Sequence, residues 1–394
     1  MRKIAAGSQK SYLVLRMREA YHVFMDIYLD DKISLMLTRA TATNRSIMLV
    51  PTDVCQPAAP DIRYAKLLRF GIPELMSYLQ IPKRNPLGIV VPDPQNRVRA
   101  IGIHSTVDRM TRLGAPFLLL CDADDSDATA LVPKDSRVYV QHPARIVLGM
   151  ARRLRRLELA KKLTRQQALL MMVKLCLELC GTYAHDPFDP NNASVVFNIE
   201  QRLTCDELKG FLKGEGNEQG LSLARDAVKL AYDLSGSPQE SFMGPALFFS
   251  SRLGGLGLCD FVANKELDLT PKERASIEWR TITPDFQLVG YNAVVEYLGE
   301  IHKEGDNPRI DHRRSLDYQT LGKREFAFWY EDVNTQKAFM ESAARLKSAI
   351  EQFDGPAVRK RFKRLASNPA FQKRQRTLFS VFRPWLRCYS IKDM

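Results

Sequence analysis

At 394 residues the chain exceeds one typical hydrophobic core, so two or three domains are expected. Hydrophobic residues make up 45% of it, as in ordinary globular proteins, and no uncharged apolar stretch reaches the roughly 18 residues of a membrane span. The formal net charge of +13 favours an acidic partner. The basic start, residues 1–10, is not followed by the apolar region of a secretion signal, so cytoplasmic residence is expected.

Residues 1–145 predict a mixed α/β region. Residues 12–40 have apolar positions three and four apart, which is the spacing of a helix, and helical patches recur within 59–79. Runs of apolar, β-branched and aromatic residues then predict strands. These runs are 87–91, 98–104, 117–121 and 137–141.

A strand passing into a helix is predicted from Val138 to Ala151, in the sequence VYVQHPARIVLGMA. In this piece the chain weakly resembles abortive-infection antitoxins of the AbiEi kind. That resemblance implies at most a scaffold or DNA-recognition role for the N-terminal region.

Residues 146–234 predict a helical middle segment, with helices over 146–180, 204–212 and 221–232. Cys176 and Cys180 lie four residues apart and therefore share one helix face. A zinc knuckle would need two more ligands nearby, and only His185 is close in sequence. Buried free thiols are the preferred interpretation.

Residues 235–354 predict a further α/β domain. Ser237-Pro-Gln-Glu240 fits a capping box that opens a helix. Two short strands, 286–289 and 293–297, flank a turn at 290–292 and predict a hairpin. The hairpin would bring Asp285 and Glu296 together, and paired carboxylates suit Mg²⁺. A surface hairpin with solvated acids is the structural alternative.

After the hairpin, residues 311–321 predict a helix that carries Arg314, and residues 325–330 predict a closing strand. An amphipathic helix follows over 334–353, and Gly355-Pro356 ends it. The glycines of 254–257 do not follow a strand and open a helix, so a phosphate-binding loop is not predicted there. They are interpreted as a turn that shapes a wall of the site.

The motifs of this domain resemble those of the PD-(D/E)XK nuclease superfamily, and in particular the small domains related to very-short-patch repair endonucleases. That pattern is a helix-borne Glu, a strand-associated Asp, an apolar strand ending in Glu, a helix with Arg, and a final strand. The likeness covers about 236–346 and implies a restriction-endonuclease-like mixed sheet flanked by helices. The expected fold is thus α/β, or α+β for the whole chain. The matching residues are Pro284-Asp285, Val295-Glu296-Tyr297, Gly299, His302, Asp311, Arg314 and Leu321-Gly322.

The resemblance implies that Asp285 and Glu296 are ligands of Mg²⁺ or Mn²⁺, with Glu240 as outer-shell support. It implies that His302 is a general base or a phosphate contact. Arg314 would contact a phosphate, or pair with Asp311 at i, i+3. Capping alone also explains Glu240.

Leu298 departs from the family pattern, which has Lys at this position, or Asp in the close relatives. Alternate residues of a strand share a face, so Leu298 is predicted to face the metal together with Glu296. Either Glu300, His302 or Lys303 substitutes for the missing Lys or Asp side chain, or the nuclease activity is weak or absent.

The segment 355–394 predicts a basic C-terminal tail, with eleven Lys/Arg against one acid, Asp393. Clustered cations neutralise phosphates and release counterions, which favours DNA, with RNA as the alternative. A solvated helix face is the structural alternative. The cations assigned to nucleic acid are Arg359, Lys360, Arg361, Lys363, Arg364, Lys373, Arg374 and Arg376. A second basic cluster lies within 152–165.

The sequence therefore predicts a metal-dependent DNA endonuclease that Leu298 weakens. The first alternative is a catalytically inactive DNA-binding or antitoxin-like regulator that keeps the nuclease fold as a scaffold. A protein-interaction module whose basic tail meets an acidic partner is the second alternative. No membrane partner is expected.

Overall fold

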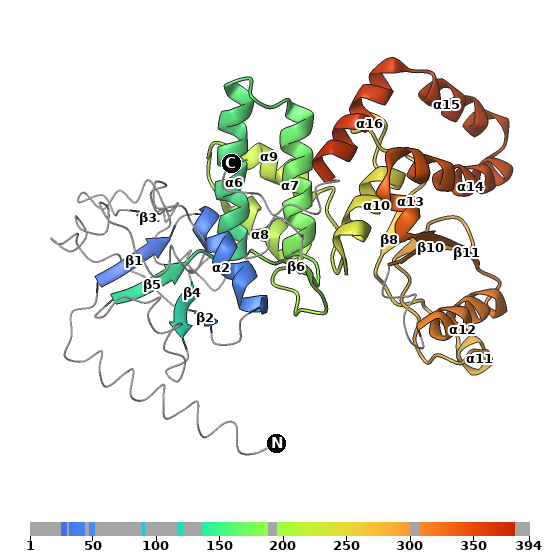
Figure 1. Cartoon of the computed structure of the whole chain (residues 1–394), viewed down its shortest axis with the longest axis horizontal. Coiled ribbons are helices and arrows are strands. Elements are labelled where there is room, and N and C mark those ends of the chain that lie inside the picture. The colour runs from blue at the N-terminus through green and yellow to red at the C-terminus, as the bar shows by residue number, and fades with distance from the viewer. Residues whose placement is uncertain are drawn as a thin grey trace, which may run out of the picture. The chain divides into compact units, whose positions relative to one another are not determined.

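The computed structural model describes residues 25–29, 31–43, 47–51, 89–90, 117–121, 136–187, 195–299 and 307–382 (Figure 1). The chain divides into two compact units. The first comprises Met1–Met150, Asp186–Asp189 and Tyr389–Met394, and the second comprises Ala151–His185 and Pro190–Cys388. Helices and mixed sheets occur together, so the predicted α+β class is confirmed.

The first unit contains a five-stranded sheet of order β2-β4-β5-β1-β3. Its only described parallel pair is β1 with β5, and the other pairs are antiparallel. Helix α2 (Asp31–Thr43) buries Ile33, Leu35 and Leu37. The strands are β1 (Met25–Leu29), β2 (Ile47–Pro51), β3 (Ile89–Val90), β4 (Phe117–Cys121) and β5 (Ser136–Val140).

The predicted helix over 12–40 is wrong for Met25–Leu29, which form β1. Ile27 pairs with Val138 of β5, a partner more than 100 residues away in the sequence. Such long-range pairing overrides a local helical pattern. The predicted strands at 117–121 and around 137–141 are confirmed as β4 and β5. The predictions at 12–24, 59–79 and 98–104 lie outside the described residues.

The predicted helical stretch 146–180 forms two helices, α6 (Pro143–Leu159) and α7 (Arg165–Leu179). They are separated because Lys161 adopts a φ of 57° and Thr164 caps α7 in a capping box with Gln167. The helix start predicted at Thr204 is confirmed by a second capping box, which opens α8 (Cys205–Gly214). Helix α9 (Leu221–Val228) follows, and the short strands β6 (Ala184–His185) and β7 (Val195–Val196) pair nearby.

The second unit also contains a four-stranded sheet of order β11-β10-β9-β8 (Figure 1). Strand β9 pairs antiparallel with both β8 and β10, and β10 pairs in parallel with β11. The predicted hairpin is present, with Phe286 opposite Val295 and a turn at Gly290, where φ is 83°. Helix α12 makes the crossover that a parallel β10–β11 pair requires. These elements are α10 (Pro238–Phe248), β8 (Phe261–Ala263), α11 (Pro271–Ser276), β9 (Phe286–Leu288), β10 (Ala293–Leu298), α12 (Asn307–Thr320) and β11 (Arg324–Trp329).

Residues 355–382 are folded helices that share the core of this unit. After α13 (Tyr330–Asn334) and α14 (Gln336–Asp354), the chain turns at Gly355 into α15 (Pro356–Ala366) and α16 (Pro369–Phe382). Phe379 of α16 lies 4.8 Å, ring centre to ring centre, from Phe242 of α10. The basic segment is therefore partly structural, because α16 contributes buried aromatic rings.

Helix α16 packs against the glycine-rich turn 254–257. A Cβ at Gly254, where φ is 91°, would lie 2.5 Å from the carbonyl oxygen of Arg374. Only glycine combines this conformation with so close an approach. The turn thus has a packing role against α16.

Candidate metal centre and basic surfaces

The hairpin brings Asp285 and Glu296 together. Asp285 lies just before β9, and its Oδ2 accepts a hydrogen bond of 2.6 Å from the backbone N–H of Tyr297. The backbone N–H of Asp285 donates in turn to Oε2 of Glu296 at 3.4 Å. The two carboxylates are therefore held by each other's strands, as the hairpin geometry predicts.

Glu240 reaches the same place from α10, and it also caps that helix. Ser237 Oγ accepts from the Glu240 backbone N–H at 3.1 Å, and Glu240 Oε1 accepts from Ser237 Oγ at 2.9 Å. Oε2 of Glu240 accepts from the Gly236 backbone N–H at 2.7 Å. The capping interpretation is confirmed, and both carboxylate oxygens take part in it.

The three carboxylates repel one another in a buried environment. Burial, and next the charge of Asp285, raise the pKa of Glu296 to about 8. Burial, with a smaller effect of Glu296, raises the pKa of Glu240 to about 7. Burial and the charge of Glu240 hold the pKa of Asp285 well above its ordinary value. A positive charge placed among these groups would favour their ionised forms.

Arg314 and Tyr318 of α12 face this cluster. They are four residues apart and thus lie on one face of the helix. The Tyr318 hydroxyl, which is fully buried, donates to Oε1 of Glu296. The positive charge of Arg314 lowers the pKa values of both Asp285 and Glu296. None of the ion pairs between described residues involves Arg314, so it is not held in an ion pair with Asp311.

Tyr318 was not predicted from the sequence. Its spacing from Arg314 on a helix was a usable signal, because both residues project from the same face toward the hairpin. His302, together with Glu300 and Lys303, lies outside the described residues.

Leu298 ends β10 and is buried, with 6% of its surface exposed. It lies two residues after Glu296 and therefore shares that face of the strand. Its partner in β11 is Trp329, which is 37% exposed. An apolar pair thus lies beside the carboxylates, where the family pattern has a polar or charged side chain.

The donor set fits one divalent cation held mainly by two residues. Asp285 and Glu296 offer carboxylate oxygens, which Mg²⁺ and Mn²⁺ prefer. Glu240 fits a supporting role, because helix-cap hydrogen bonds occupy its two oxygens; the oxygens of Glu296 also accept hydrogen bonds, from the Asp285 N–H and the Tyr318 hydroxyl. The ligand oxygens of the three carboxylates do not all lie within 4.8 Å of one another. Elsewhere in the described chain, the ligand atoms of Cys180, Cys205 and Asp233 do.

The two basic clusters differ in how their charges are paired. In the first, Arg152 pairs with Glu218 at 2.5 Å and Arg165 pairs with Asp226 at 2.7 Å. Arg155 pairs with Glu158 at 2.7 Å. Acids of the same unit already neutralise much of this cluster, which favours the structural interpretation there.

The cations of α15 and α16 are mostly unpaired. Arg359 lies 3.8 Å from Glu351, Arg361 donates to the Gly257 carbonyl at 2.9 Å, and Arg374 donates to the Ser251 carbonyl at 2.9 Å. The remaining predicted cations are exposed and form no ion pair with a described residue. They are Lys360, Lys363, Arg364, Lys373 and Arg376.

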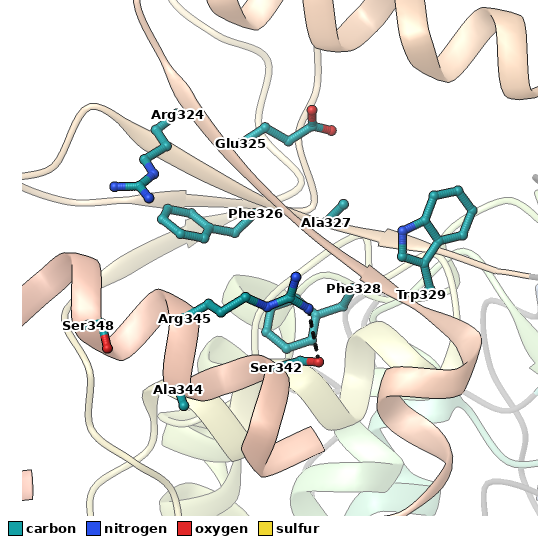
Figure 2. Close-up of a pocket in the computed structure, with 10 residues that line it drawn as sticks. All are labelled: Arg324, Glu325, Phe326, Ala327, Phe328, Trp329, Ser342, Ala344, Arg345 and Ser348. Atoms are coloured by element: carbon teal, nitrogen blue, oxygen red, sulfur yellow. Dashed lines mark hydrogen bonds between the residues drawn. The ribbon is translucent and has the colours of Figure 1, made fainter. Parts of the chain in front are cut away.

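A groove of about 660 Å³ runs between β11 and α14. Figure 2 shows Arg345, Ser342 and Ser348 of α14 on the side of Phe326 and Phe328, with Glu325 pointing away. Strand β11 is the edge of its sheet in the described structure, so its outer backbone groups border this groove.

Two cationic side chains and an aromatic ring line the groove. The Arg324 guanidinium lies 4.9 Å from the centre of the Phe326 ring, and 71% of the Arg345 side chain is exposed. Stacked Arg and aromatic groups of this kind suit bases and phosphates. No signal in the sequence marked this groove, which exists only once α14 packs beside β11.

In comparisons with known proteins, no family model, no curated protein and no solved structure matches the chain. Within the described residues, no helix combines the length and apolarity needed to cross a bilayer.

Proposed function

We propose that the protein is a metal-dependent DNA endonuclease of the PD-(D/E)XK type, with slow chemistry because of Leu298. One observation carries the proposal: three acids, from α10, from the residue before β9 and from β10, converge in a buried cluster beside Arg314, where burial and mutual repulsion raise their pKa values. Buried acids with raised pKa values and a charged neighbour are typical of functional sites. The order of helix, hairpin, crossover helix and final strand also agrees with the motif pattern.

Each residue has a defined task in this proposal. Asp285 and Glu296 hold Mg²⁺ or Mn²⁺, and Glu240 keeps the cluster negative from its position in the helix cap. Tyr318 fixes the orientation of the Glu296 carboxylate through its hydrogen bond. Arg314 contacts a phosphate oxygen. When bound, the metal would orient the attacking water and neutralise charge on the leaving oxygen.

DNA would be held by the unpaired cations of α15 and α16, with RNA as the alternative. Arg324, Arg345 and Trp329 lie on or beside β11, next to the strand that carries Glu296, and extend the proposed contact surface. Cytoplasmic localisation is part of this proposal.

The alternative is a catalytically inactive DNA-binding regulator that uses the same fold as a scaffold. Leu298 favours it, because a buried leucine neither ligates a metal nor positions water. The complete engagement of Glu240 in capping also favours it.

Nicking of supercoiled plasmid tests the catalytic proposal. We expect slow, Mg²⁺- or Mn²⁺-dependent nicking by the native protein, and loss to background in Asp285→Asn. Asparagine keeps an acceptor for the Tyr297 N–H but removes the charge. The matched control is Asp317→Asn, since Asp317 is also buried but accepts from the backbone N–H groups of Glu278 and Trp279 instead. Equal nicking by native protein and Asp285→Asn would contradict the proposal.

Substituting Lys360, Lys363 and Arg364 together by Gln tests the nucleic-acid surface. These residues share one face of α15 and are unpaired. We expect weaker duplex binding at low salt and a salt slope reduced by up to about 3, near 0.9 per lost phosphate contact. Deleting residues 355–394 is a poorer test, because it removes the core aromatic rings of α16.

The control for this experiment is Arg155→Gln with Arg165→Gln, where ion pairs already use the charges. This pair should leave the salt slope unchanged. An unchanged slope in the α15 variant as well would identify its cations as a solvated face.

A further inference from the structure

Three ligand-type side chains meet far from the carboxylate cluster, where α7 ends and α8 begins. Cys180 follows the last residue of α7, Cys205 is the first residue of α8, and Asp233 lies after α9. Their ligand atoms all lie within 4.8 Å of one another. Cys180 is 0% exposed and Cys205 is 3% exposed, whereas Asp233 is only half-buried. The cluster is therefore enclosed on the sulfur side and open on the carboxylate side.

The carboxylate is oriented by fixed donors. Oδ1 of Asp233 accepts from the Gln201 side-chain amide at 2.7 Å and from the Cys205 backbone N–H at 2.8 Å. The Gln201 amide also donates to the Cys180 carbonyl at 2.9 Å, and the Leu234 N–H donates to the same carbonyl at 2.8 Å. These bonds leave Oδ2 of Asp233 for another ligand. Hydrogen bonding of this kind around a ligating carboxylate is usual in metal sites.

We propose that Cys180, Cys205 and Asp233 form a binding site for a single Zn²⁺ ion. Two sulfurs and one carboxylate oxygen are ligands that Zn²⁺ takes, and bonds of about 2.3 Å to sulfur place tetrahedral ligands roughly 3.8 Å apart. The observed spacing needs only small side-chain adjustments to reach that value. This site lies outside the proposed nuclease centre and does not depend on it.

Cys176 is the nearest further sulfur for the fourth position, although its ligand atom lies outside the group of three. It lies one turn before Cys180 on the same face of α7 and is 0% exposed. The negative charge of these thiolates and the carboxylate faces the N-terminus of α8, which favours anions. Lys209 lies one turn further along that helix. The structure confirms that Cys176, Cys180 and Cys205 are buried free thiols; the sequence pattern did not group Cys205 and Asp233 with the Cys176–Cys180 pair because they are distant in sequence.

Cobalt substitution tests the proposal on the full chain. The reduced, chelator-treated protein is titrated with Co²⁺ alone and then with Zn²⁺. We expect one equivalent of Co²⁺ to produce thiolate-to-cobalt charge transfer and the visible bands of tetrahedral Co²⁺, and Zn²⁺ to abolish both. Cys205→Ser should weaken both Co²⁺ binding and the charge-transfer band, because one thiolate is lost, and Asp233→Asn should weaken Co²⁺ binding roughly tenfold to a hundredfold. Cys259→Ser is the control, since this free thiol lies outside the cluster.

Zinc-dependent thermal stabilisation of the native protein gives a second measurement that needs no variant. A rise in melting temperature with Zn²⁺ that Cys259→Ser keeps and Asp233→Asn reduces would support the site. Absence of cobalt bands in the native protein would overturn it, as would bands of equal strength in Cys205→Ser. A Cys180–Cys205 disulfide in untreated protein, with no metal bound after reduction, would also overturn it. Plasmid nicking is measured in parallel, and zinc binding is expected whether or not the protein nicks DNA.

Discussion

Leu298→Lys is expected to raise Mg²⁺-dependent plasmid nicking by about two orders of magnitude, which is the usual contribution of a positioned proton-transfer group. The new ammonium group would lie on the face of β10 that carries Glu296. It would favour the ionised forms of the neighbouring acids, whose pKa values are raised, and their charges would then compensate it. Leu298→Asp, which introduces the residue of the repair-endonuclease-like domains that the sequence resembles, is expected to act in the same direction.

The double variant Leu298→Lys with Asp285→Asn is the control, and it should return nicking to background. Fast nicking by the native protein that Asp285→Asn abolishes would show that Leu298 does not weaken the site. If neither restored variant nicks DNA and no Mn²⁺ binds, the scaffold alternative is favoured. Circular dichroism establishes that each variant is folded.

The free energy of unfolding is expected to fall as the pH rises from about 4.5 to 8. In the unfolded chain a Glu has an ordinary pKa near 4.5, whereas Glu240 and Glu296 in the folded protein have pKa values of about 7 and about 8. The folded state therefore binds more protons than the unfolded state across this window, so raising the pH favours unfolding. Both groups are buried, and together they make the expected loss several kcal/mol.

Urea unfolding at pH 5.5 and pH 8, followed by tryptophan fluorescence, measures this loss. Glu296→Gln should flatten the dependence and be more stable than native protein at pH 8, since Gln still accepts from Tyr318. Mg²⁺ should recover stability at pH 8 in native protein, because it binds only the folded state. The control is Glu273→Gln, whose exposed carboxylate has a lowered pKa owing to hydrogen bonds with Thr270. An identical pH slope in Glu296→Gln and native protein would contradict the assignment.

Local signals in the sequence predicted the parts of the site that local structure forms. Gly290 between two apolar runs predicted the hairpin, and the hairpin alone brings Asp285 to Glu296. Ser237 with Glu240 predicted the start of α10, because the Ser237 N-cap and its hydrogen bonds with Glu240 are formed within four residues, although the second Glu240 oxygen accepts from Gly236 and not from the N-cap backbone.

Contacts between distant segments could not be predicted from the sequence because they leave no periodic pattern. β1 exists through Ile27 opposite Val138, although the surrounding residues have helical spacing. Tyr318 reaches Glu296 only because α12 crosses over the sheet. Cys205 joins Cys180 for a similar reason, through the docking of α8 on the end of α7. The nuclease role of the cluster stays a prediction.

The packing of α16 on α7 has a consequence for synthesis on the ribosome. The Gln166 side chain at the start of α7 donates to the Arg374 carbonyl of α16, 208 residues later in the chain. Translation at about 5–20 residues per second separates the two helices by roughly 10 to 40 s. During that interval α7, which is buried along most of its length in the finished unit, lacks one of its covering helices. The nascent chain thus presents an apolar helix for chaperones to shield, and its yield should depend on their supply.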